Sequence, residues 1–188
     1  MTSVIKVDTI QNSSGTSSMS IASNGFVIPP AGGIIQTQYT QIDATSQWTV
    51  NQNTDKQITV LAVNITPVSA NSIIKIEAMV NGEWSDAGAP YNSTWFFFRD
   101  STKLATTVSS NNAGILMGTS LTYEAVDASS TPEHANYMYF DSPSSTSQIT
   151  YTVGVRTSQP STYWNLNRCV NNSGENGVSV ITATEIAG

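Results

Sequence analysis

The stretch YFDSPSSTSQITYTVGVR (residues 139–156) joins two runs rich in β-branched and aromatic residues through a polar turn. Pro143 fixes its own φ and restricts Ser142 to extended backbone, while Asp141 is a residue type that accepts hydrogen bonds from a turn. The run SVITATEI (residues 179–186) has the same strand-forming character. This region therefore predicts antiparallel β-strands joined by short turns.

The same pattern continues outward from this stretch as far as Ile34. Segments of alternating or β-branched character recur at short intervals, and almost none has the period of a helix. Residues Arg99–Lys103 and Asn171–Gly177 are turn-forming and predict hairpins, the second between the last two strands. We expect nine strands, at residues 34–42, 57–65, 72–80, 94–99, 115–123, 136–141, 149–156, 163–167 and 178–186. Short antiparallel strands at this spacing predict an all-β fold, an antiparallel β-sandwich of the jelly-roll type.

Residues 1–33 differ from the rest of the chain because their apolar residues form small clusters separated by Ser, Asn and Gly. PPAGG (residues 29–33) has the composition of a hinge. No cluster can bury enough surface to offset its ordering entropy, so we expect an extended arm held by sister subunits or by a larger assembly. The candidate anchoring residues are Val4, Ile5, Val7, Ile10, Phe26, Val27 and Ile28. The predicted domains are the arm, residues 1–33, and the sandwich, residues 34–188.

Charge and hydropathy exclude several classes of partner. Only 11% of residues are charged and the net charge is −6, which argues against a basic groove for nucleic acid. No apolar run approaches the roughly 18 residues that span a bilayer, and the N-terminus lacks the apolar core of a signal peptide. We therefore expect synthesis in the cytosol, no membrane insertion and no nucleic-acid partner.

Catalytic and metal-binding chemistry has little support. Cys169 is the only cysteine and His134 the only histidine, so neither an intrachain disulfide nor a common zinc site can form within one chain. Cys169 is predicted to be a small core residue and His134 a solvated residue of a loop. We expect no enzyme activity and no cofactor. Two metal sites remain open, one made by three His134 side chains on the axis of a trimer and one made by Glu124, Asp127 and Glu133.

Two aromatic segments are candidate receptor- or glycan-binding surfaces. The first, NGEWSDAGAPYN (residues 81–92), sets Trp84 and Tyr91 among Asp86 and Asn92. Flat rings beside polar acceptors suit sugar recognition. The second candidate is the pair Tyr163 and Trp164. In each case the alternative is that the tryptophan closes the end of the sandwich.

Several motifs give the chain a resemblance to a known family. They are VDTIQN (residues 7–12), MSIASNG (19–25), PPAGGIIQ (29–36), ITPVSANS (65–72), FRDS (98–101), FDSP (140–143) and TEI (184–186). Taken together, they resemble the fibre and virion-surface structural proteins of bacteriophages. The resemblance covers nearly the whole chain and rests on turns and strand edges rather than on catalytic residues.

The resemblance implies a homotrimeric protein on the virion surface. In this family, N-terminal arms tie subunits to each other or to other virion proteins, and the C-terminal sandwich faces outward. The implied function is that of a tail fibre or fibre-tip protein that attaches to a host-surface glycan or receptor. Two alternatives are a capsid decoration or head-fibre protein with no host-binding role, and a carbohydrate-binding module.

Overall fold

A computed structural model describes residues 6–105, 112–121, 130, 132–171 and 174–188. The described residues form β-strands, turns and loops and contain no helix. None of them therefore belongs to a helix long and apolar enough to cross a membrane. The strands are β1 (Thr9–Gln11), β2 (Ser17–Ile21), β3 (Val27–Ile28), β4 (Ile34–Ile42), β5 (Ser46–Val50), β6 (Lys56–Ile65), β7 (Ile73–Trp84), β8 (Ser93–Arg99), β9 (Thr102–Leu104), β10 (Leu116–Met117), β11 (Ser120–Leu121), β12 (Glu133–Asp141), β13 (Ile149–Thr157), β14 (Thr162–Leu166) and β15 (Ser179–Ile186).

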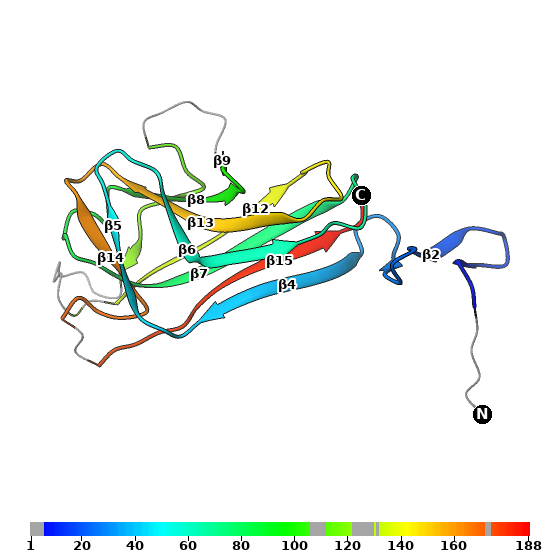
Figure 1. The fold of residues 1–188 in the computed structure, drawn as a ribbon, viewed down its shortest axis with the longest axis horizontal. Coiled ribbons are helices and arrows are strands. Elements are labelled where there is room, and N and C mark those ends of the chain that lie inside the picture. Colours follow the sequence, from blue (N-terminus) through cyan, green and yellow to red (C-terminus); the bar gives the residue numbers. More distant parts are fainter. Residues whose placement is uncertain (1–5, 106–111, 122–129, 131, 172–173) are drawn as a thin grey trace.

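Two antiparallel sheets pack face to face and form the sandwich (Figure 1). The first contains β4, β15, β7 and β12 in that spatial order, and the second contains β6, β13, β8 and β9. This is the strand order of a jelly roll, so the predicted fold class is confirmed. The pair β14–β5 continues the first sheet beside the far end of β7, because β15 pairs only with residues 73–79 of that long strand.

The core lies between the two sheets and follows the alternation of the strands. In β7 the even-numbered residues Ile74, Ile76, Ala78 and Val80 point inward and are buried, while the odd-numbered residues between them face outward. Strand β8 is buried along almost its whole length, because its run of large aromatic side chains packs away from water. Burial of these side chains is the main source of stability for a chain that can form no intrachain disulfide.

A buried carboxylate joins the last strand to the loop between β6 and β7. Glu185 is fully buried, and its Oε1 accepts hydrogen bonds from Val68 N at 2.7 Å and Ser72 Oγ at 2.6 Å. Its Oε2 accepts a hydrogen bond from Gln36 Nε2 at 2.6 Å. These donors stabilise a charge that would otherwise be unfavourable inside the protein. The contact fixes the end of the sandwich from which the N-terminal segment emerges.

The N-terminal segment is not the extended arm that we expected. Strands β1, β2 and β3 pair antiparallel in chain order and form a small separate sheet, here called the N-terminal sheet, beyond one end of the sandwich (Figure 1). Its turns form where Ser, Asn and Gly cluster. Asn12 Oδ1 accepts hydrogen bonds from the backbone N–H groups of Ser14 and Thr16, and Gly15 and Gly25 adopt positive φ. Local turn chemistry therefore gives this segment regular structure despite its lack of a core.

The hinge contacts the end of the chain. Gly32 N donates to Ala187 O at 2.7 Å, and Ala187 N donates to Gly33 O at 2.8 Å. The first and last residues of the sandwich are thus bonded side by side at the end that carries the N-terminal sheet.

Two other expectations were wrong. In place of the single strand predicted at residues 115–123 the structure has two short strands, separated by a turn in which Gly118 has positive φ. Strand β10 pairs with β8, and β11 pairs with β12. The last two strands do not form a hairpin, since β14 pairs with β5 and β7 while β15 pairs with β4 and β7. The predicted hairpin between β8 and β9 is confirmed.

Candidate functional site

The two aromatic segments singled out in the sequence lie together at the end of the sandwich opposite the N-terminal sheet. Trp164 in β14 lies directly opposite Trp84 in β7. Beyond this pair, Ser85 N donates to Tyr163 O at 2.9 Å, and Tyr163 N donates to Ser85 Oγ at 3.0 Å. The sequence suggested two separate surfaces, and the structure joins them into one.

Trp84 and Trp164 are fully buried and cannot present a ring to a ligand. With Trp95 they form a cluster in which the centroid of the Trp164 ring lies 5.3 Å from that of Trp84 and 5.1 Å from that of Trp95, both in edge-on geometry. The assignment of these two tryptophans to a glycan surface is therefore wrong. The alternative, that they close the end of the sandwich, is correct.

Thr119 holds this cluster through its hydroxyl. Its Oγ1 accepts from Trp84 Nε1 at 3.0 Å and from Trp95 Nε1 at 3.2 Å. Thr119 also shares a hydrogen bond with Ser93 Oγ at 3.1 Å. Two buried indole N–H groups thus depend on one side chain in the turn between β10 and β11.

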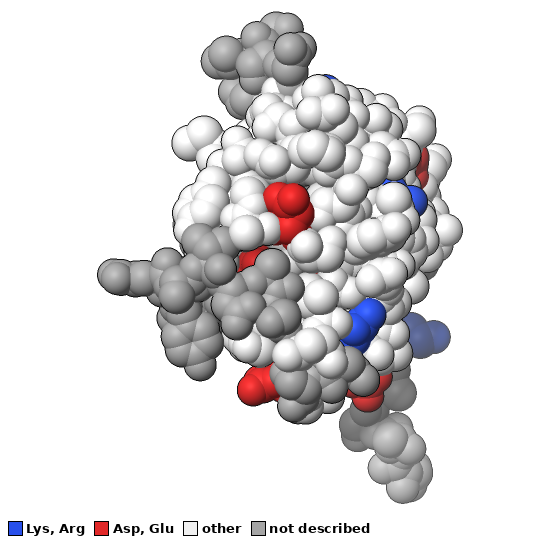
Figure 2. All heavy atoms as spheres, turned by 90° about the vertical axis from the view of Figure 1, so that its left-hand side faces the viewer, with Lys and Arg blue, Asp and Glu red and all other residues white. Residues whose placement is uncertain are grey.

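The remaining candidate residues of this surface are accessible, but only the tyrosines expose large rings. Tyr91 is 61% exposed and Tyr163 44% exposed. Asp86 and Asn92 bond within their own loop, since Asp86 Oδ1 accepts from Gly88 N and Asn92 Nδ2 donates to Gly88 O, each at 2.8 Å. Figure 2 looks onto this end of the molecule and shows isolated acidic and basic side chains on a largely uncharged surface. Its chemistry suits contacts to neutral polar groups.

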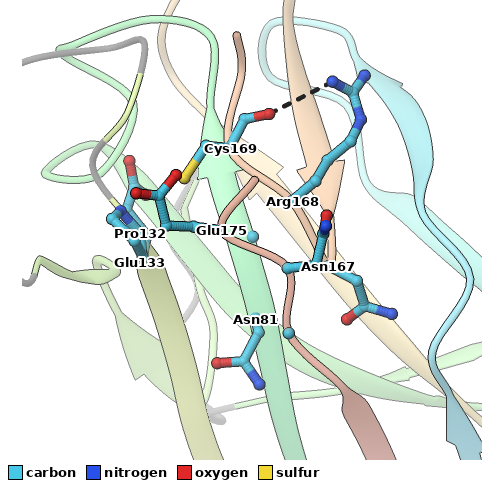
Figure 3. Close-up of a pocket in the computed structure, with 10 residues that line it drawn as sticks. Asn81, Pro132, Glu133, Asn167, Arg168, Cys169 and Glu175 are labelled. Atoms are coloured by element: carbon cyan, nitrogen blue, oxygen red, sulfur yellow. Dashed lines mark hydrogen bonds between the residues drawn. The ribbon is translucent and has the colours of Figure 1, made fainter. Parts of the chain in front are cut away.

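A hollow of about 230 Å³ opens near the same end, between β7, the start of β12 and the connection from β14 to β15. Its walls include Asn81, Glu133, Arg168, Cys169 and Glu175 (Figure 3). Arg168 directs its guanidinium toward the carbonyl oxygens of Cys169 and Val170, both at 3.3 Å from Nη1. No pattern in the sequence predicted this hollow, because its walls come from three distant segments.

Carboxylates dominate the electrostatics of the hollow. Glu133 is 4% exposed, and burial is the main reason that its pKa rises to about 8. The nearby Glu83 raises the pKa of Glu133 further, while the hydrogen bond from Trp84 N lowers it. Burial, Glu83 and Glu175 together raise the pKa of the Cys169 thiol to about 11. This thiol is buried and protonated at neutral pH, as predicted for a core residue, and is no nucleophile.

The described residues offer no metal centre within one chain. They contain no group of three or more His, Cys, Asp and Glu side chains that could hold an ion. Glu124 and Asp127, two of the three residues considered for calcium, lie outside the described residues. His134 lies in β12, where it pairs with Asn81 and Ser120, rather than in the loop expected from the sequence.

The candidate anchoring residues lie in or beside the N-terminal sheet, apart from Val4 and Ile5, which are outside the described residues. Val7, Ile10, Phe26 and Val27 are exposed, as is Ile21, and Ile28 is half-buried. The hinge bonds of Gly32 and Gly33 attach the segment to the sandwich without covering these side chains. Most of the candidate anchoring residues that the structure describes are therefore exposed in the single chain.

Comparison with known proteins adds no relative. No model of a known protein family matches the chain, and no curated protein matches its sequence. The argument for function therefore rests on the fold, the N-terminal sheet and the surface at the far end of the sandwich.

Proposed function

We propose that this protein is a structural protein of a bacteriophage virion surface, a homotrimer of the tail-fibre or fibre-tip type. In this proposal the N-terminal sheet joins the subunits to each other and to the particle. The jelly roll forms a head that projects outward and contacts the host surface. The observation that carries the proposal is the apolar surface of the N-terminal sheet, which the described residues of the chain leave exposed.

The positions of the two ends of the molecule support one anchored end and one host-facing end. The N-terminal sheet and the C-terminus lie at one end of the sandwich, and the loop that bears Tyr91 lies at the other (Figure 1). A protein anchored through its N-terminal sheet would present the Tyr91 end away from the anchor. This supports host attachment over a decoration role confined to the shell.

Localisation on the particle tests the proposal directly. Cryo-electron microscopy of virions, with antibody labelling of the head, should place the jelly roll at the tip of a tail fibre. Density on the capsid shell would establish the decoration role instead. Absence of the protein from purified particles would refute the virion assignment.

Host attachment is tested by binding of the intact protein to host cells and to a glycan array. We expect Tyr91→Ala and Tyr163→Ala to reduce binding at least tenfold, because both rings are large, aromatic and exposed among the described residues of the far end. Tyr39→Ala is the matched control, since Tyr39 is an exposed tyrosine on the outer face of β4. Equal loss in all three variants, or no binding by the unmodified protein, would count against host attachment.

A further inference from the structure

The register of the N-terminal sheet shows which side chains share each of its two faces. Ile10 lies opposite Met19, and Ile21 lies opposite Val27, so all four side chains share one face. The other face carries Thr9 and Ser20, which pair with each other, and Ser18, together with Ile28, which lies opposite Ser20 and is half-buried. The first set is called the apolar face and the second the hydroxyl face.

The apolar face is open to solvent in the single chain. Ile10 is 45% exposed, Ile21 38% and Val27 47%. An antiparallel sheet normally packs an apolar face of this kind on a core. Three strands of two to five residues supply no core of their own. None of the described residues covers this face.

Charge indicates an identical partner. Residues 9–28 contain no Asp, Glu, Lys or Arg, and the nearest charged residue is Asp8, just outside β1. Identical faces therefore meet without repulsion, and a charged partner has no complementary group to bind. The hydroxyl face remains directed to water in such an assembly.

The width of the sheet indicates three copies. Strands lie about 4.8 Å apart and packed sheets about 10 Å apart, so three strands give a sheet roughly 14 Å wide. In a triangle with sides of that width, each sheet lies about 4 Å from the axis, close to half the usual spacing between packed sheets. Four copies would leave each sheet about 7 Å from the axis and would open a void.

We propose that three copies of the N-terminal sheet pack as a triangular prism, with Ile10, Met19, Ile21 and Val27 turned toward a shared threefold axis. This inference deepens the proposed function and rests on its homotrimer. Because β2 is the central strand, Met19 and Ile21 lie nearest the axis. The strands run along the axis, so the turns at Gly15 and Gly25 lie at opposite ends of the prism. The hydroxyl faces form its outer surface.

The test compares neighbouring residues on opposite faces of the full-length protein. Ile10→Asp and Ile21→Asp place charges on the apolar face, and Thr9→Asp and Ser20→Asp place them on the hydroxyl face. Light scattering after size-exclusion chromatography should give three times the chain mass for the unmodified protein and for the hydroxyl-face variants. The apolar-face variants should dissociate to the mass of one chain, with at least a hundredfold rise in dissociation constant. Tryptophan fluorescence checks that the head stays folded in every variant.

Cross-linking gives a second readout of the same geometry. Under oxidising conditions Ile21→Cys should form disulfide-linked pairs of chains, because the central strands meet at the axis, and Ser20→Cys should not. The native Cys169 is buried and does not compete. Formation of equal amounts of linked chains by both variants would overturn the assignment of faces.

The measured masses distinguish failure of this inference from failure of the proposed function. If the apolar-face variants remain trimeric, the prism is wrong and the trimer is held by the heads. A mass of two chains for the unmodified protein would overturn the threefold arrangement. A single-chain mass at all concentrations would overturn both the prism and the proposed homotrimer.

Discussion

Glu185 shows how one side chain can determine the shape of a loop. The carboxylate accepts hydrogen bonds from the loop and from β4, and its position in the last strand places the loop against the end of the sandwich. The sequence TEI near the C-terminus contains this residue but does not reveal that it points inward. Only the pairing of β15 between β4 and β7 establishes that orientation.

We predict that Glu185→Gln lowers the free energy of unfolding by about 2–4 kcal/mol, because an amide nitrogen would face donors that need an acceptor. Urea unfolding followed by tryptophan fluorescence measures the change. Glu77→Gln is the control, since Glu77 forms a partly exposed ion pair with Lys75 at 2.9 Å, and its effect should stay within about 0.5 kcal/mol. Equal effects of the two substitutions would show that the buried carboxylate has no special role.

Glu133 should make stability depend on pH. Its pKa is about 8 in the folded protein against an ordinary value of 4.5, so the folded state binds the proton more tightly than the unfolded state does. The contribution of Glu133 to the free energy of unfolding is therefore greatest at low pH and falls as the pH rises from about 4.5 to about 8.

We predict that Glu133→Gln removes this decline. At pH 5 the variant and the unmodified protein should unfold at similar urea concentrations, and at pH 8.5 the variant should be more stable by an amount on the order of a few kcal/mol. A neutral amide at this position avoids the burial of a charge, and its oxygen can still accept from Trp84 N. Parallel pH profiles for the two proteins would contradict the prediction.

At the scale of the strands, the residue pattern of each segment predicted most of the strands. The remaining strands and boundaries depend on packing between distant segments. Strand β4 begins and ends where its β-branched residues predict, at Ile34 and Ile42. Strand β7 was expected to end at Val80, where the candidate binding segment of residues 81–92 begins, yet it continues to Trp84. A Cβ atom at Gly82 would come within 2.7 Å of the Trp164 ring, so this glycine serves close packing inside the strand.

The same strand explains the error over Trp84. Its position continues the even-numbered phase of Ile74, Ile76 and Val80, which points into the core. Extending that phase past residue 80 would have predicted burial of Trp84 from the sequence alone. No comparable signal exists for the hollow beside Glu133, because its walls meet only after the sheets have paired.

The tryptophan cluster gives a prediction at this scale. Thr119→Val keeps the shape of the side chain but removes the acceptor shared by Trp84 and Trp95. We expect a loss of about 2–3 kcal/mol in the free energy of unfolding, because two buried N–H groups lose their partner. Thr182→Val, in the half-buried outer row of β15, should change it by less than about 0.5 kcal/mol. Thermal unfolding followed by circular dichroism would measure both.

For the whole molecule, the sequence predicted the all-β sandwich correctly but not the small sheet formed by the N-terminal segment. The apolar clusters of residues 1–33 predicted a segment that depends on partners, and this stays a prediction. The expectation of an extended arm failed because it weighed burial alone. The Asn and Gly turns supply hydrogen bonds and backbone conformations that allow a small sheet to form.

We predict that deletion of residues 1–30 leaves the head folded and abolishes incorporation into particles. The hydrogen bond between Ala187 N and Gly33 O is retained, so the thermal midpoint of the isolated head at equal chain concentration should fall by no more than a few degrees. Mass spectrometry of purified virions would measure incorporation. Full occupancy by the truncated protein would show that the head carries the anchoring surface.

The pairing of β4 with β15 also determines how the head bears mechanical load. A pull that arrives through the hinge enters at Ile34 and acts along β4, which runs with the long axis of the sandwich (Figure 1). Hydrogen bonds between antiparallel strands lie across the strands, so this pull shears the whole β4–β15 ladder at once instead of opening it bond by bond. Under flow, a tethered head would therefore stay intact while the hinge and the N-terminal sheet stretch first.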